Sequence, residues 1–75
     1  MHPFNYSYQE QDFQAVVQHF SEGFANRFRI FTSMESFVIA PTNHDKTIWL
    51  QADGQPLPYD LIQAVGEGLE AAGIY

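Results

Sequence analysis

Near its middle, the chain changes from helical spacing of its apolar residues to strict alternation, and this change constrains the fold most. The segment 27–34 reads RFRIFTSM. Its side chains fall into two sets, one with Phe28 and Ile30 and the other with Arg27, Arg29 and Phe31. A period of two residues is typical of a β-strand with two different faces. We therefore predict a strand over about residues 27–34.

Two further short runs predict strands over about residues 37–41 and 47–52. The first run is aromatic and β-branched and is closed by Pro41, because proline cannot donate a hydrogen bond to a sheet ladder. A polar loop of about five residues joins the two runs as a hairpin. The junction at residues 34–36 leaves two alternatives, a tight turn that makes three strands in this region, or a bulge in one bent strand that makes two.

Helical spacing predicts a first helix over about residues 8–26. Ser7 followed three residues later by Glu10 matches a capping box, in which the two residues satisfy the first free N–H groups of a helix. The apolar residues that follow recur at the spacing of one helical face. They are Phe13, Val16, Val17, Phe20 and Phe24.

A second helix is predicted over about residues 58–72. Its apolar stripe consists of Leu61, Ile62, Val65 and Leu69. Gly73 followed by Ile74 is typical of a Schellman ending. Gly66 and Gly68 weaken the helix interior, so we expect either close packing against another element or local mobility there.

These elements predict a single α+β domain over residues 1–75, with the order α-β-β-(β)-α. Both helices are expected to cover one face of an antiparallel meander of two or three strands, which gives a small two-layer fold. A chain of 75 residues buries only ~60% of its unfolded surface. Disulfides and cysteine zinc sites are excluded, because the chain has no cysteine.

The net charge of −6 disfavours direct binding to nucleic acid. Nine acidic residues stand against three basic ones, whereas nucleic-acid affinity depends largely on Lys and Arg contacts to phosphate. The sequence shows neither a signal-peptide pattern nor an apolar run of membrane-spanning length. We therefore expect a soluble cytoplasmic protein without membrane contact.

Metal, cofactor and catalytic sites are not expected. His19 and Glu22 can share a metal with His44 and Asp45 only if a loop and a helix converge, and nothing in the sequence fixes that geometry. No nucleophile elbow, phosphate-binding glycine loop or paired-carboxylate setting is present. We expect no enzyme activity.

Protein binding is the expected function, because every strand carries apolar side chains on both faces. The expected core-facing residues are Phe28, Ile30, Ile48 and Leu50. The expected partner-binding residues on the other face are Arg27, Arg29, Phe31, Phe37, Ile39 and Trp49. Aromatic residues and arginine are enriched in interface centres, so we expect a homodimer through this face, and a regulatory role on a partner protein. Two simpler explanations stay open: the segment 2–8 covers the face, or the arginines pair with nearby acids.

Two alternative functions follow from the charge and from the aromatic residues. The first is a phage-type inhibitor that imitates nucleic acid and binds a basic DNA- or RNA-binding protein. Its acids would lie along helix surfaces, at Asp12, Glu22, Glu67 and Glu70. The second is weak single-strand binding, with bases stacked on Phe31 and Trp49 and the backbone held by the two arginines.

Overall fold

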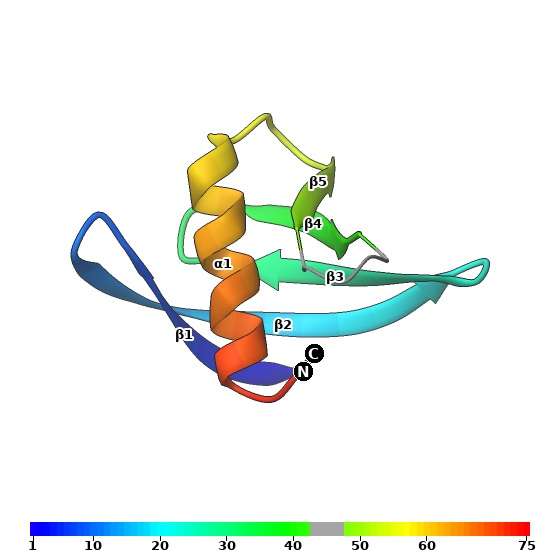
Figure 1. Ribbon diagram of the computed structural model, residues 1–75, viewed down its shortest axis with the longest axis horizontal. Coiled ribbons are helices and arrows are strands. Elements are labelled where there is room, and N and C mark those ends of the chain that lie inside the picture. The colour runs from blue at the N-terminus through cyan, green and yellow to red at the C-terminus, as the bar shows by residue number, and fades with distance from the viewer. Residues whose placement is uncertain (43–47) are drawn as a thin grey trace.

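The computed structural model describes residues 1–42 and 48–75 of the chain. Five antiparallel strands form one sheet in sequence order, and one helix follows them in the described residues (Figure 1). The elements are β1 (His2–Tyr8), β2 (Gln11–Glu22), β3 (Ala25–Phe31), β4 (Ser36–Pro41), β5 (Trp49–Asp53) and α1 (Tyr59–Ala71). The α+β class is confirmed, whereas the predicted two helices and their order are wrong.

The segment 8–26, predicted as a helix, forms strand β2 and parts of its neighbours. Tyr8 pairs with Gln11, so Gln9 and Glu10 alone make the turn, with φ angles of 52° and 64°. Positive φ at both central residues is the mark of the type I′ turn, whose twist suits a hairpin. Glu10 is therefore a turn residue and caps no helix. The hydroxyl of Ser7 donates to the Asp12 carboxylate across the hairpin, at 2.7 Å.

The apolar spacing in β2 fits a strand as well as a helix. Side chains at odd positions, such as Ala15 and Val17, are buried on one side of the sheet. Val16 and Phe20 lie on the opposite side, where they pair with Phe31 and Arg27 of β3. Phenylalanine and valine favour pleated, half-buried surfaces, and pairing on both sides of β2 satisfies its backbone. Tertiary pairing therefore overrides the helical pattern.

The β3–β5 region contains three strands, because the chain turns at residues 32–35, so the alternative of a bulge is wrong. The Thr32 hydroxyl accepts the backbone N–H groups of Met34 and Glu35 at 3.2 and 3.1 Å. The Thr32 N–H donates to the Glu35 carbonyl at 2.9 Å. These bonds end β3 at Phe31 and start β4 five residues later. The predicted hairpin loop between β4 and β5 falls largely on residues 43–47, which lie outside the described residues.

Strand β5 has the opposite orientation to the one predicted. Trp49 is buried with 1% of its surface exposed, whereas Leu50 is 53% exposed and Ile48 43%. A shift of one residue in register moves every side chain of a strand to the other face. Both sets in this strand are apolar, so alternation alone could not choose between them.

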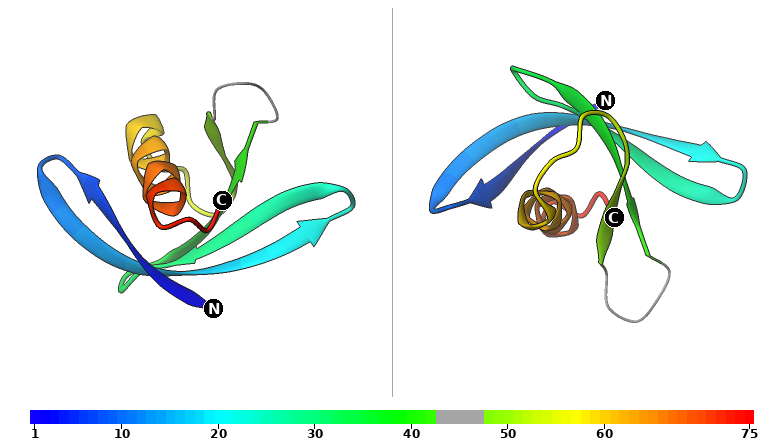
Figure 2. Two further views of the ribbon diagram at one scale, coloured as in Figure 1. Left: turned by 60° about the horizontal axis from the view of Figure 1, so that its bottom comes forward. Right: turned by 90° about the horizontal axis from the view of Figure 1, so that it is seen from above.

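Helix α1 lies in the concavity of the bent sheet, between the two edge strands β1 and β5 (Figure 2). Its glycines allow this close approach. A Cβ atom at Gly66 would lie 2.1 Å from the Trp49 ring, and one at Gly68 would lie 2.6 Å from the Asn5 carbonyl oxygen. Of the two alternatives for these glycines, close packing is confirmed. The Schellman ending is also confirmed, because the Ile74 N–H donates to the Leu69 carbonyl at 3.0 Å.

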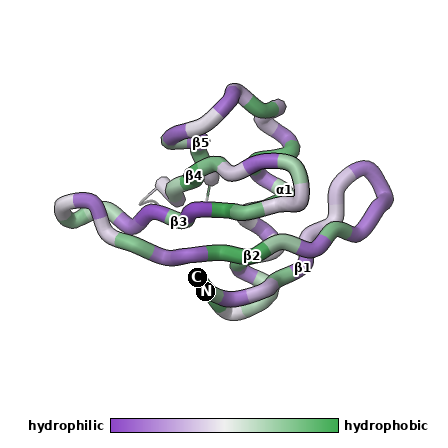
Figure 3. Tube along the Cα trace, turned by 180° about the vertical axis from the view of Figure 1, so that it is seen from behind, coloured by the Kyte–Doolittle hydropathy of each residue, from purple (hydrophilic) through white to green (hydrophobic). Residues whose placement is uncertain are grey.

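The core fills the space between α1 and the concave side of the sheet. We call this side the inner face and the convex side the outer face. The buried cluster contains Phe4, Ala15, Val17, Phe28, Ile30, Phe37, Ile39, Trp49, Ile62, Val65 and Leu69. Seen from behind the view of Figure 1, β2 and β3 carry both hydrophobic and hydrophilic stretches (Figure 3). The described part of the chain places no helix over the outer face.

A candidate binding face on the outer side of the sheet

The outer face carries a strip of aromatic, aliphatic and arginine side chains from β2 and β3. Three cross-strand pairs make it: Val16 with Phe31, Gln18 with Arg29, and Phe20 with Arg27. We call these six residues the outer strip. Gln18 is exposed and the other five are half-buried. Val38 of β4, opposite Arg29, is buried beside the strip. The strip therefore combines apolar surface with positive charge on an acidic protein.

Contacts within the protein orient both arginines of the strip. The Arg29 guanidinium lies over the Phe20 ring, 5.5 Å from its centroid, which is a cation–π contact. Arg27 Nε lies 3.4 Å from a Glu22 carboxylate oxygen, and its Nη1 donates to the Asn26 carbonyl at 3.2 Å. The expectation that the arginines pair locally thus fits Arg27. An exposed pair of this kind contributes only ~0–1 kcal/mol to stability.

The six predicted partner-binding residues divide between the two faces. Arg27, Arg29 and Phe31 lie together on the outer face, as predicted. Phe37, Ile39 and Trp49 lie on the inner face, buried in the core. Trp49 is held there by its indole N–H, which donates to the Glu70 carboxylate at 2.8 Å. The prediction that these three residues share an exposed face with the arginines is wrong.

The N-terminal segment 2–8 does not cover the outer face. It forms the edge strand β1 and directs Phe4 into the core, where 4% of its surface is exposed. Tyr6, on the same side as Phe4, packs against the core cluster. The simpler explanation for the apolar outer face is therefore wrong.

The acids of the mimicry hypothesis do not form a row on helix surfaces. Asp12 and Glu22 lie on the outer face, at the two ends of β2, where each has a local partner. Glu67 and Glu70 lie on α1, which covers the inner face, and Glu70 accepts the indole N–H of Trp49. The four carboxylates thus divide between opposite sides of the protein.

His19 and Glu22 cannot converge on one metal ion. They lie three residues apart in β2, so their side chains leave opposite faces of the sheet. The His19 ring stacks on Phe28, with centroids 4.8 Å apart, and its Nε2 lies 3.0 Å from Asn26 Oδ1. His44 and Asp45 lie outside the described residues. Within residues 1–42 and 48–75, no three histidine or acidic side chains form a metal-binding group.

Residues on the free edge of β5 protect it from pairing with another strand. The Gln63 amide of α1 accepts the Trp49 N–H at 2.9 Å and donates to the Trp49 carbonyl. The Gln51 side chain donates to the carbonyl oxygens of Asp53 and Gln55 and accepts the Leu57 N–H. The Gln63 side chain thus occupies both backbone groups of Trp49, which another strand would need.

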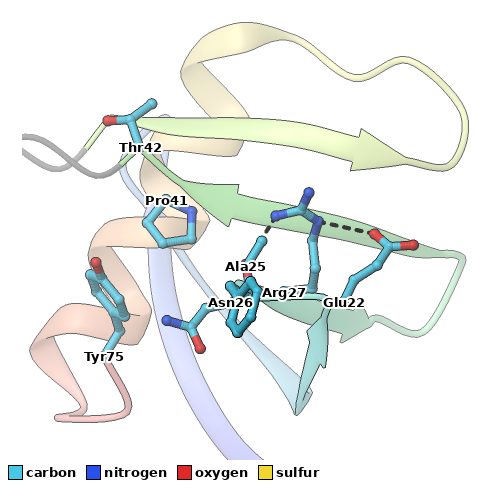
Figure 4. A pocket seen from close by; sticks show the side chains of 8 residues that line it. Glu22, Ala25, Asn26, Arg27, Pro41, Thr42 and Tyr75 are labelled. Carbon is cyan, nitrogen blue, oxygen red and sulfur yellow. Dashed lines mark hydrogen bonds and ion pairs between the residues drawn. The ribbon is translucent and has the colours of Figure 1, made fainter.

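A cavity of about 500 Å³ opens beside the β2–β3 turn (Figure 4). Its lining includes Arg27 of the outer strip and its ion-pair partner Glu22, together with Pro41, Thr42 and Tyr75. The Tyr75 ring packs edge-on against Trp49, with centroids 5.2 Å apart. Phe24, at the tip of the turn, is fully exposed. The cavity is a recess at this end of the sheet, lined by residues of both faces.

Sequence reasoning missed Phe20, Val16 and Val38 as residues of the outer face. Val16 and Phe20 were assigned to the buried stripe of a helix. The alternation of Ala15 and Val17 with Val16 in β2 was a signal for a two-sided strand, but it covers too few residues to outweigh the helical spacing.

No helix in the described residues is long and apolar enough to cross a membrane.

Comparisons of this chain with protein-family models, with curated proteins and with solved structures found no match. Its function must therefore be inferred from its own residues.

Proposed function

We propose that the chain is a small protein-interaction module that associates with a second copy of itself through the outer face of its sheet. The observation that carries the proposal is the outer strip, where Val16, Phe20 and Phe31 are half-buried and no described element covers them. An antiparallel sheet with one solvated face normally alternates apolar with polar side chains. We assign the module no catalytic role.

The protected edges of the sheet favour association through the face. Gln63 already bonds both backbone groups of Trp49 on the β5 edge. On the β1 side, α1 packs so closely that a Cβ atom at Gly68 would lie 2.6 Å from the Asn5 carbonyl oxygen. Strand addition at the β5 edge would compete with the Gln63 bonds, and at the β1 edge it would meet α1 near Asn5. Pairing of two copies through their outer faces leaves these contacts intact.

The charges on the outer face suit a two-fold interface. Arg27 and Arg29 lie within the strip, and the carboxylates of Asp12 and Glu22 lie toward the two ends of β2. In a two-fold arrangement the same patch meets itself. An antiparallel arrangement can place the arginines of one copy beside carboxylates of the other. Such pairing offsets the repulsion between two chains that each carry a net charge of −6.

Sedimentation equilibrium at tens of micromolar protein tests the proposal. We expect the wild-type chain to show the mass of two copies. Phe31→Glu places a charge in the centre of the strip, where the side chain is already partly solvated, so we expect it to fold and to show the mass of one copy. Circular dichroism of the variant checks the fold.

Tyr59→Ser is the matched control, because Tyr59 is 63% exposed and starts α1 on the other side of the protein. We expect this variant to associate as the wild type does. A wild-type mass of one copy, or the same loss in Tyr59→Ser as in Phe31→Glu, would contradict the proposed interface.

A further inference from the structure

A second cavity, of about 230 Å³, lies at the other end of the sheet, away from the β2–β3 turn. Residues of the β1–β2 hairpin, of the β3–β4 turn and of the first half of α1 enclose it. Its lining includes Tyr6, Tyr8, Phe13, Met34, Glu35 and Phe37. A cavity of about 150 Å³ is enough to hold benzene, so this one has room for a small branched group.

Aromatic rings make up much of the cavity wall. The rings of Tyr6 and Phe13 lie nearly parallel, with centroids 5.4 Å apart and an interplanar angle of 21°. Phe13 is 38% exposed, and Tyr8 adds a third ring beside the cavity. The faces of aromatic rings carry negative electrostatic potential, which attracts cations within about 6 Å of the ring centroid. The wall therefore suits a positively charged group better than an anion.

Glu35, an exposed acidic residue, also lines the cavity. Its backbone is fixed in the β3–β4 turn, because its carbonyl accepts the Thr32 N–H at 2.9 Å and its own N–H donates to the Thr32 hydroxyl at 3.1 Å. Burial, and after it the nearby charge of Glu35, raise the pKa of the Tyr6 hydroxyl above its ordinary value, so this hydroxyl is neutral beside the cavity at neutral pH. The Tyr8 hydroxyl donates to the Asp60 carboxylate at 3.2 Å, close to the same cavity.

The protein supplies no counter-charge to these carboxylates in its described part. The ion pair found there joins Arg27 to Glu22, at the opposite end of the sheet. Arg29 lies on the outer face over Phe20. The rings and carboxylates around the cavity thus combine the two features by which proteins bind organic cations.

We propose that this cavity binds an alkylammonium group, such as the trimethylammonium head of a choline-type molecule or of a methylated lysine side chain. The rings contact the methyl groups, and Glu35 balances the charge. A trimethylammonium group is smaller than benzene and fits the volume. This site lies on the inner side of the sheet and does not depend on association through the outer face.

A nuclear magnetic resonance titration with choline tests the proposal on the whole chain. We expect shifts in the ring signals of Tyr6, Tyr8 and Phe13 and in the Met34 methyl signal at millimolar choline. The neutral isostere 3,3-dimethylbutan-1-ol has the same shape without the charge, and it should bind at least several-fold more weakly. Equal binding of the two compounds, or no shift of these signals with either one, would overturn the proposal.

Two variants test separately the aromatic ring of Phe13 and the charge of Glu35. Phe13→Leu removes a partly exposed ring and should weaken choline binding about two- to fivefold. Glu35→Gln keeps the shape and removes the charge, and it should weaken binding by a similar factor while leaving the neutral compound unaffected. Glu67→Gln, on the exposed part of α1, is the control and should bind as the wild type does. A Glu35→Gln variant that is folded and binds choline with unchanged affinity would overturn the role of the carboxylate.

The same titration with a trimethyl-lysine peptide and its unmethylated counterpart distinguishes the source of the cation. Tighter binding of the methylated peptide than of choline assigns the cavity to a modified protein. Tighter binding of choline assigns it to a free small molecule. Either result supports the alkylammonium site, whereas a preference for the unmethylated lysine would contradict it.

Discussion

The two faces of the sheet carry similar residue types but expose them very differently. On the inner face, Phe28, Ile30 and Ile39 are 2%, 0% and 0% exposed beneath α1. On the outer face, Phe20 and Phe31 are half-buried and Arg29 lies over the Phe20 ring. The inner face therefore supplies most of the hydrophobic stabilisation, while the outer face leaves apolar surface partly exposed. Residue type alone does not determine which role a face has.

The largest difference in stability loss between substitutions on the two faces is expected in β5, where the adjacent residues Trp49 and Leu50 point in opposite directions. Trp49→Ala removes a buried ring and the hydrogen bond to Glu70, so we expect it to lower the free energy of unfolding by about 3–5 kcal/mol. Leu50→Ala changes an exposed side chain and should cost less than about 1 kcal/mol. Urea denaturation of both variants measures the difference. Equal losses would show that the assigned orientation of β5 is wrong.

The contact between α1 and β5 can be tested next, at Gly66. Alanine favours a helix by about 1 kcal/mol over glycine, but its Cβ would lie 2.1 Å from the Trp49 ring. We expect Gly66→Ala to destabilise the fold by a net ~1–3 kcal/mol. Glu67→Ala, on the exposed neighbouring position, should change stability by less than about 0.5 kcal/mol. A Gly66→Ala variant that is more stable than the wild type would refute the close packing of α1 on Trp49.

A smaller effect is expected on the outer face, from the contact of Arg29 with Phe20. A double-mutant cycle with Arg29→Ala and Phe20→Ala should give a coupling energy of about 0.5–1 kcal/mol, because the guanidinium lies 5.5 Å from the ring centroid at a partly exposed site. The same cycle run on Arg29 and Phe31 is the control. A coupling energy near zero in the first cycle would mean that the Arg29–Phe20 contact does not stabilise the fold.

The smallest predicted effect concerns pH. Burial and the charge of Glu35 raise the pKa of Tyr6 above its ordinary value of 10.0, so the folded state favours the neutral hydroxyl. The stability from this preference is fully present below pH 10.0 and is lost as the pH rises through the raised pKa of the folded state. Tyr6→Phe should make the unfolding free energy less sensitive to pH in this range. An unchanged pH dependence in this variant would contradict the assignment.

The sequence correctly predicted those elements whose apolar residues follow only one periodicity, either that of a strand or that of a helix. The alternation around Phe28 and Ile30 correctly gave a two-sided strand, and the stripe that includes Ile62 and Val65 gave α1. The prediction of a helix was wrong for the segment 11–22, because its apolar residues fit helical spacing and strand spacing equally well. Pairing of β2 with strands on both sides decided the outcome, and such long-range pairing is not visible in a local pattern.

The candidate site was predictable only in part, for a related reason. Arg27, Arg29 and Phe31 belong to the strand with clear alternation, so their common face was predicted correctly. Trp49 belongs to a strand with apolar residues on both sides, and its orientation depends on the space that Gly66 leaves in α1. That space results from the packing of two distant segments.

Association through the outer face is the central claim, and one measurement tests it most directly. A soluble paramagnetic agent enhances the relaxation of nuclei at exposed surfaces, so its effect can be compared residue by residue in dilute and concentrated protein. We expect the residues of the outer strip to lose this enhancement as the concentration rises, while Tyr59, on the other side of the protein, keeps its enhancement. Unchanged enhancement along the strip at concentrations where the chain self-associates would contradict the claim, and so would protection confined to β5.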